Sequence, residues 1–231
     1  MHFKNSFLQT WIPHKPRYLA FMLGLIILLL AHALFDSAAR GARLLDITFL
    51  IVFVTTLFAA WRQVWFIVAV VVLGVPMFGL QMLSNFFHAG LLEIISHVFG
   101  ALFFSFLFVS ILIDILKTSK VTMNTIYGAV SVYLLIGIAW TFLFGLVEHI
   151  HPGSISMPQT LEPFLVSKQQ HFNVLMYFSF TSLTTLGFGD INPVVPIART
   201  LSYLEAVIGQ LYLTILVARL VGLHIATTQN H

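Results

Sequence analysis

The sequence predicts an all-α membrane protein, and three observations lead to that prediction. Hydrophobic residues make up 59% of the 231 positions and charged residues only 8%, far below the roughly one quarter typical of soluble domains. Six long apolar stretches follow one another with short polar segments between them. A seventh apolar stretch is shorter and leads directly into a segment rich in glycine and threonine.

The six long stretches are the expected transmembrane helices. A spanning helix needs about 20 largely apolar residues, and in lipid the backbone of such a segment must satisfy its own hydrogen bonds. The stretches of about this length are 18–35, 44–60, 64–82, 92–116, 126–147 and 197–221. The second is short, and only residues 61–63 separate it from the third.

Lysine and arginine predict the orientation. With the N-terminus inside, seven of the 11 basic residues lie on the cytoplasmic side and four outside, so the positive-inside rule favours cytoplasmic N- and C-termini. Arg40 and Arg43 oppose this orientation. The letters AHA at 31–33 raise the alternative of a cleaved signal peptide, but the long segment before the first stretch and its near-spanning length favour a retained helix.

The composition excludes several classes of function. The chain has no cysteine, so disulfides, thiolate metal sites and cysteine nucleophiles are ruled out. Its net charge of +3 is scattered at the ends of segments, which fits membrane flanks better than a nucleic-acid surface. A membrane enzyme or metal-handling protein needs acids, bases or ligands that converge on one site, and the histidines and acids of this chain are scattered along it apart from the weak cluster at 148–151.

The seventh apolar segment, 172–183, has about 12 residues and is therefore expected to be re-entrant or interfacial. The sequence TTLGFGD follows it at 184–190. Non-helical backbone at membrane depth is tolerated where it lines a polar cavity. Gly187 and Gly189 alternate with larger residues and permit positive φ, so successive carbonyls can point the same way and replace the water shell of a cation.

Residues 185–190 resemble the signature of the tetrameric potassium channel family, usually Thr-Val-Gly-Tyr-Gly-Asp, with Leu186 in the valine place and Phe188 in the tyrosine place. The resemblance covers residues 172–223, together with the preceding helix 126–147. It implies a pore helix at 172–183, an inner helix at 197–221 and a homotetramer with one filter strand from each chain. The selectivity filter that it implies consists of Thr185, Leu186, Gly187, Phe188 and Gly189, the first four of which coordinate K⁺.

The resemblance also implies residues that support the filter, namely Thr184, Asp190, Tyr177 and Phe178. Tyr177 and Phe178 occupy the positions of the family's aromatic cuff. Because Phe188 has no hydroxyl and Phe178 no donor, one bond of the family is absent, whereas a bond between Tyr177 and Asp190 remains available. We therefore expect a less firmly braced filter whose conductance decays during prolonged opening.

On the inner helix, Gly209 follows Gly189 by 20 residues, the family's spacing for a gating hinge. Close helix packing is the alternative explanation of this glycine. If Gln210 faces the pore axis, three further residues share its face at helical spacing and would line the cavity and gate; otherwise they face lipid. These three residues are Leu213, Val217 and Val221.

Three ionisable residues are candidate modulators. Glu205 is an acid within a membrane helix, so either a protonated structural role behind the filter or a role in gating is expected. His149 and His151 lie beside Glu148 at the end of the fifth helix and are either a solvated helix end or a sensor of protons or zinc. His32, His88 and His97 are expected at interfaces or within the helix bundle.

Four helices before a two-helix pore resemble the plan of voltage-gated cation channels. Stretch 92–116 contains Glu93, His97 and Asp114 but no arginine or lysine, and steep voltage dependence takes three to four charges per subunit. We therefore expect a gate that does not respond to voltage. The expected regions are a cytoplasmic segment 1–17, a four-helix domain 18–120, a pore domain 121–225 and a tail 226–231.

The sequence thus predicts a potassium-selective channel and not an enzyme, with a weakly selective monovalent cation channel as the alternative. The expected partners are the lipid bilayer, K⁺ and further copies of the chain, with no cofactor and no nucleic acid; an unidentified regulatory partner is a further hypothesis. The compact plan, with no cytoplasmic domain expected after residue 225, favours a multi-pass protein of a bacterial inner membrane.

Overall fold

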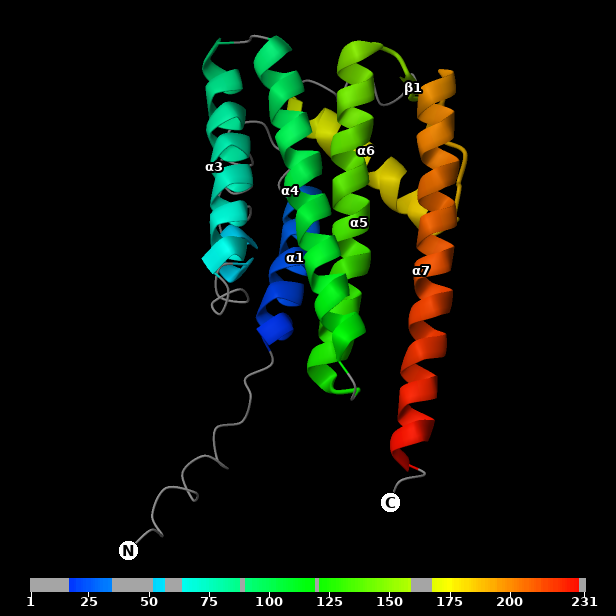
Figure 1. Ribbon diagram of the computed structural model, residues 1–231. Helices are drawn as coiled ribbons and strands as arrows, with labels where there is room; N and C mark the ends of the chain where they lie inside the picture. The colour runs from blue at the N-terminus through cyan, green and yellow to red at the C-terminus, as the bar shows by residue number, and fades with distance from the viewer. Residues whose placement is uncertain are drawn as a thin grey trace, which may run out of the picture.

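The computed structural model describes residues 17–34, 52–56, 64–87, 90–118, 121–158 and 168–228. Within them it is a helical bundle with one two-stranded sheet (Figure 1). The helices are α1 (Arg17–Leu34), α3 (Val64–Phe87), α4 (Gly90–Lys117), α5 (Met123–Ile150), α6 (Lys168–Leu183) and α7 (Pro196–Thr228). The strands β1 (Ile155–Ser156) and β2 (Asn192–Pro193) pair antiparallel.

Four helices in the described residues are long and apolar enough to cross a membrane, namely α3, α4, α5 and α7. Helix α1 begins one residue before the predicted stretch 18–35, but its apolar part with described side chains, Arg17–Ala31, is shorter than a full span. Most of the predicted stretch 44–60 lies outside the described residues, and only 52–56 are seen, as helix. An all-α membrane protein is therefore supported, and the count of six spans stays a prediction.

The predicted boundaries of the other helices are too narrow. Helix α6 begins at Lys168 instead of residue 172, and α7 reaches Thr228 instead of residue 221. Apolar length marks only the part of a helix in hydrocarbon, and polar residues continue the helix beyond it. The pair β1 and β2 was not expected from the sequence; it joins the segment after α5 to the segment before α7.

Aromatic residues fill the core between α4 and α5. Phe104 and Phe142 stack with ring centroids 5.4 Å apart, and both side chains are fully buried. The ring of Phe142 lies over Gly100, where a side chain would overlap with it. Helix α5 begins with a capping box in which Thr122 and Thr125 satisfy each other's backbone N–H groups. Helix α5 is therefore held in place by α4, and α6 and α7 pack against it.

Helix α7 is attached to the rest of the bundle at three levels. Near its start, Trp140 Nε1 of α5 donates to Leu201 O at 3.2 Å, and further along Tyr212 donates its hydroxyl to Ala129 O at 2.7 Å. Near its end, Arg219 donates to Ile115 O and Leu116 O at the last turn of α4 and to Thr118 O. These contacts attach α7 to α5 at two levels and to the end of α4 at the third.

Helix α6 is the short element between them. In Figure 1 it runs obliquely from the end of the bundle where α5 ends to a point part of the way along α7, and the chain then returns toward the start of α7. The segment 184–190 lies on this return path.

Candidate functional site

The segment 184–190 is attached to the last turn of α6 by its own backbone N–H groups. Thr184 and Thr185 donate to Phe180 O and Ser182 O at 3.1 and 2.9 Å. The N–H groups of Leu186 and Gly187 both donate to Thr181 O, at 2.9 and 3.2 Å. Because these donors satisfy the free carbonyls at the end of α6, the carbonyls of the segment itself are left for other partners.

Positive φ angles alternate along this segment. Thr185, Gly187 and Gly189 have φ of 58°, 50° and 78°, with Leu186 and Phe188 between them in ordinary conformations. Alternation of left- and right-handed residues turns successive carbonyls toward one side. For Thr185 the left-handed conformation is uncommon and costs about 1–3 kcal/mol, which is typical of functional sites.

The carbonyl oxygens of this segment differ in whether the described residues donate hydrogen bonds to them. Gly189 O accepts from Asn192 Nδ2 at 2.7 Å. In the part of the chain that the structure describes, the carbonyl oxygens of Thr185, Leu186, Gly187 and Phe188 accept no protein hydrogen bond. These four residues are the ones to which the resemblance assigns K⁺ coordination, and all four are exposed in the single chain.

Tyr177 contacts the C-terminal part of the segment. Its hydroxyl donates to Asp190 Oδ2 at 2.8 Å, and this bond raises the pKa of Tyr177. Its ring lies parallel to that of Phe188, with centroids 6.5 Å apart. Phe178 points the other way, is buried and packs edge-on against Phe144 of α5 at 4.9 Å. The hydrogen bond between Tyr177 and Asp190 that the sequence left available is therefore present.

Near the start of the segment, Gln210 of α7 contacts Thr185. Gln210 Nε2 donates to Thr185 Oγ1 at 3.1 Å, and Thr185 Oγ1 donates to Thr184 O at 2.6 Å. Leu213, Val217 and Val221 are exposed on α7. Leu211 and Ile215 are exposed as well, so exposure in the single chain does not distinguish a pore face from a lipid face.

Gly209 and Glu205 lie where α7 contacts the end of α6. A Cβ at Gly209 would overlap with the carbonyl oxygen of Leu183, so close packing is observed here, whereas the hinge stays a prediction. Glu205 is fully buried and lies 2.5 Å from Ser179 Oγ. This contact gives Glu205 a partner that sequence reasoning did not name.

The two candidate histidines separate in the structure. His151 is exposed and ends α5, where its N–H donates to Val147 O at 2.8 Å. His149 Nε2 lies 3.4 Å from Glu93 Oε2, and its ring meets that of His97 at 4.7 Å. No group of three or more His, Asp or Glu within the described ranges could hold a metal ion. Sensing of protons or zinc by these histidines stays a prediction.

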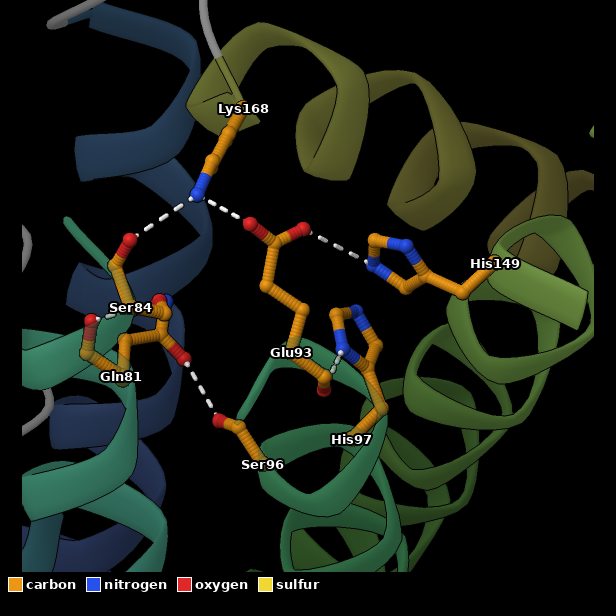
Figure 2. A network of polar contacts seen from close by, with 7 residues as sticks. All are labelled: Gln81, Ser84, Glu93, Ser96, His97, His149 and Lys168. Carbon is orange, nitrogen blue, oxygen red and sulfur yellow. Dashed lines mark hydrogen bonds and ion pairs between the residues drawn. The ribbon is translucent and has the colours of Figure 1, made fainter. Parts of the chain in front are cut away.

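Figure 2 shows the network to which His149 belongs. Lys168 at the start of α6 forms an ion pair with Glu93 Oε1 of α4 and donates to Ser84 O of α3 at 3.1 Å. The Glu93 carboxylate therefore joins α4, α5 and α6, and Lys168 adds α3 to the network. Nearby on α6, burial lowers the pKa of His171, while Glu148 opposes that shift. Sequence reasoning missed this network because its members lie far apart in the chain.

Comparison with known proteins gives one match. Residues 160–224 match a family model described as "Ion channel". No curated protein and no solved structure matches the chain. The match covers α6, the segment 184–190 and most of α7. It supports an ion channel in the membrane and a transport role in place of an enzymatic one.

Proposed function

We propose that the chain forms a potassium-selective channel that conducts K⁺ passively. The proposal is supported chiefly by the four adjacent carbonyls of residues 185–188, which accept no bond from the described part of the protein and follow alternating positive φ angles. Oxygens arranged in this way replace the water shell of a monovalent cation. The match of residues 160–224 to an ion-channel model agrees with this function.

One chain supplies one filter strand, and a ring of carbonyls needs several. We therefore infer a homotetramer closed by cyclic symmetry, with the exposed face of 184–190 turned to a common axis. Native mass spectrometry of the detergent-solubilised protein is expected to give the mass of four chains. A monomer or dimer as the conducting species would contradict this assembly.

The gate is inferred not to be driven by voltage. Helix α4 has no arginine or lysine before Lys117, and voltage sensors move several charges across the membrane. If voltage does not drive the gate, the open probability is expected to be equal at about −100 and about +100 mV.

The membrane topology that we propose from the lysine and arginine distribution is that of a multi-pass protein of the cell membrane, with both termini in the cytoplasm.

Ion flux in liposomes tests the function. Wild-type protein with a K⁺ gradient is expected to pass K⁺ and not Na⁺. Gly187→Ala should abolish this flux, because Gly187 has a φ of 50° that a side chain strains. Gly79→Ala is the matched control, since Gly79 lies in α3 with open space around it and no positive φ.

A weakly selective cation channel is the second candidate. The specific observation in its favour is that Phe188 has no hydroxyl for a hydrogen bond and is 64% exposed, beside the ring of Tyr177. Reversal potentials in mixed K⁺ and Na⁺ separate the two candidates. Equal permeability would favour the second, and absence of any flux from the wild-type protein would contradict both.

A further inference from the structure

The polar contact between α6 and α7 is buried inside the single chain. The side chains of Ser179 on α6 and Glu205 on α7 are both 0% exposed. Because Glu205 is enclosed by its own chain, assembly with other copies cannot supply it with a partner. An ionised carboxylate in such a place carries a desolvation cost of several kcal/mol unless a cation or several donors offset it.

The contacts of Glu205 do not offset that cost. No lysine, arginine or histidine of the described residues forms an ion pair with it. Its Oε1 atom contacts the Ser179 hydroxyl, and its Oε2 atom is buried with no hydrogen-bond partner among the residues that the structure describes. A neutral acid avoids most of this cost, because burying one carbonyl oxygen without a hydrogen bond costs far less free energy than burying an unpaired negative charge.

The single hydrogen of the Ser179 hydroxyl independently indicates that Glu205 is protonated. Ser179 Oγ lies 2.7 Å from Gly137 O and 2.5 Å from Glu205 Oε1. A hydroxyl has one hydrogen to donate, and the carbonyl of Gly137 has none. Both contacts are hydrogen bonds only if Ser179 donates to Gly137 and Glu205 carries a hydrogen that it donates to Ser179.

We propose that Glu205 is a neutral carboxylic acid whose O–H group donates to Ser179, and that it is a positioning residue for the end of α6. The resulting chain runs from Glu205 through Ser179 to Gly137 and so joins α7, α6 and α5. One turn further along both helices, Leu183 lies against Gly209. The acid therefore fixes the helix that carries the segment 184–190 against α7.

Infrared spectroscopy tests the protonation directly. A carbonyl stretch of a protonated carboxylic acid is expected at pH 7 in wild-type protein in lipid nanodiscs. The band should shift on labelling with ¹³C-glutamate, of which the chain has four residues, and should disappear in Glu205→Gln. No protonated-acid band at pH 7, or a band that Glu205→Gln leaves unchanged, would overturn the proposal.

Ion selectivity tests the positioning role, and this second test rests on the proposed function, whereas the infrared test does not. Glu205→Gln keeps a donor toward Ser179 and should keep the K⁺ over Na⁺ ratio. Glu205→Leu fills similar space without a donor and should lower that ratio roughly fivefold, the equivalent of one lost hydrogen bond. Equal ratios in the two variants would overturn the positioning role.

A serine pair provides the matched control. Ser179→Ala removes the bridge, whereas Ser182→Ala removes another α6 to α7 contact, the 3.2 Å contact of Ser182 with Ser202, which involves no acid. The first should lower selectivity more than the second, and the reverse order would contradict the proposal. If Ser179→Ala does not fold, the comparison of Glu205→Gln with Glu205→Leu tests the positioning role by itself. A wild-type protein that conducts no ions but shows the infrared band would refute the channel function and leave the neutral acid established.

Discussion

Gly209 of α7 lies directly against the backbone of Leu183 at the end of α6. A Cβ added at Gly209 would overlap with the Leu183 carbonyl oxygen and lie 2.9 Å from its Cδ1 atom. The backbone oxygen cannot rotate away as the end of a side chain can. The absence of a side chain at position 209 is therefore a condition for the contact between the two helices, whether or not α7 also bends there.

Gly209→Ala is accordingly expected to destabilise the protein by about 1–3 kcal/mol, the usual cost of overpacking. Thermal unfolding in detergent, followed by circular dichroism, measures the effect. Gly222→Ala in the same helix is the control, since nothing lies within 4 Å of a Cβ there. If Gly209 were only a hinge, Gly209→Ala would leave stability unchanged and reduce open probability alone.

Tyr177→Phe is expected to speed the decay of K⁺ current during sustained opening. The substitution removes the bond from the Tyr177 hydroxyl to Asp190 and keeps the ring beside Phe188, so only the brace is lost. Patch-clamp recording of reconstituted protein measures the decay. Tyr203→Phe is the control, because Tyr203 is exposed on α7. Stable wild-type current through minutes of opening would show that the filter is firmly braced by other means.

Glu93→Gln should destabilise the protein more than Lys168→Gln. Glu93 is the more enclosed member, with a side chain 15% exposed against 47% for Lys168, and it contacts His149 as well. For the exposed lysine the loss should stay below about 1 kcal/mol. Unfolding midpoints of the two variants, with Lys117→Gln at the opposite end of α4 as control, give the order. A larger effect of Lys168→Gln would mean that its bond to Ser84 O dominates the network.

The backbone conformation of the segment 184–190 and one of its contacts could be predicted from the sequence, because they depend on residue type. Alternating glycines predict positive φ, and Gly187 and Gly189 have it. The tyrosine and aspartate that remained available for a brace form one, from Tyr177 to Asp190. Such features depend on residues close together in the chain, where residue type limits the backbone directly.

Contacts between segments far apart in the chain could not be predicted from the sequence in this way. Glu205 was recognised as unusual because an acid in an apolar helix is costly, but its partner Ser179 is one of many serines in the chain. His149 and Glu93 come from different helices, and only the packing of α4 on α5 brings them together. The positive φ of Thr185 was also unexpected, since a β-branched residue seldom adopts that conformation.

The contact of Gln210 with Thr185 leads to a prediction about ion entry at the Thr185 end of the proposed filter. Gln210 Nε2 donates to Thr185 Oγ1 at 3.1 Å, and the apolar Leu213 follows on the same helix. Gln210→Leu would surround that entry with apolar side chains, and hydrophobic constrictions impede ions by losing water. We expect single-channel K⁺ conductance to fall roughly fivefold, which corresponds to a barrier of about 1 kcal/mol.

Gln210→Asn separates wetting from the hydrogen bond. Asparagine stays polar but is one methylene shorter, so it keeps water at the entry and loses most of its reach toward Thr185 Oγ1. If wetting dominates, Gln210→Asn should conduct nearly as well as wild type while Gln210→Leu does not. If both variants lose conductance equally, the bond that orients the Thr185 hydroxyl is the important contribution, because that bond is what the two substitutions remove in common.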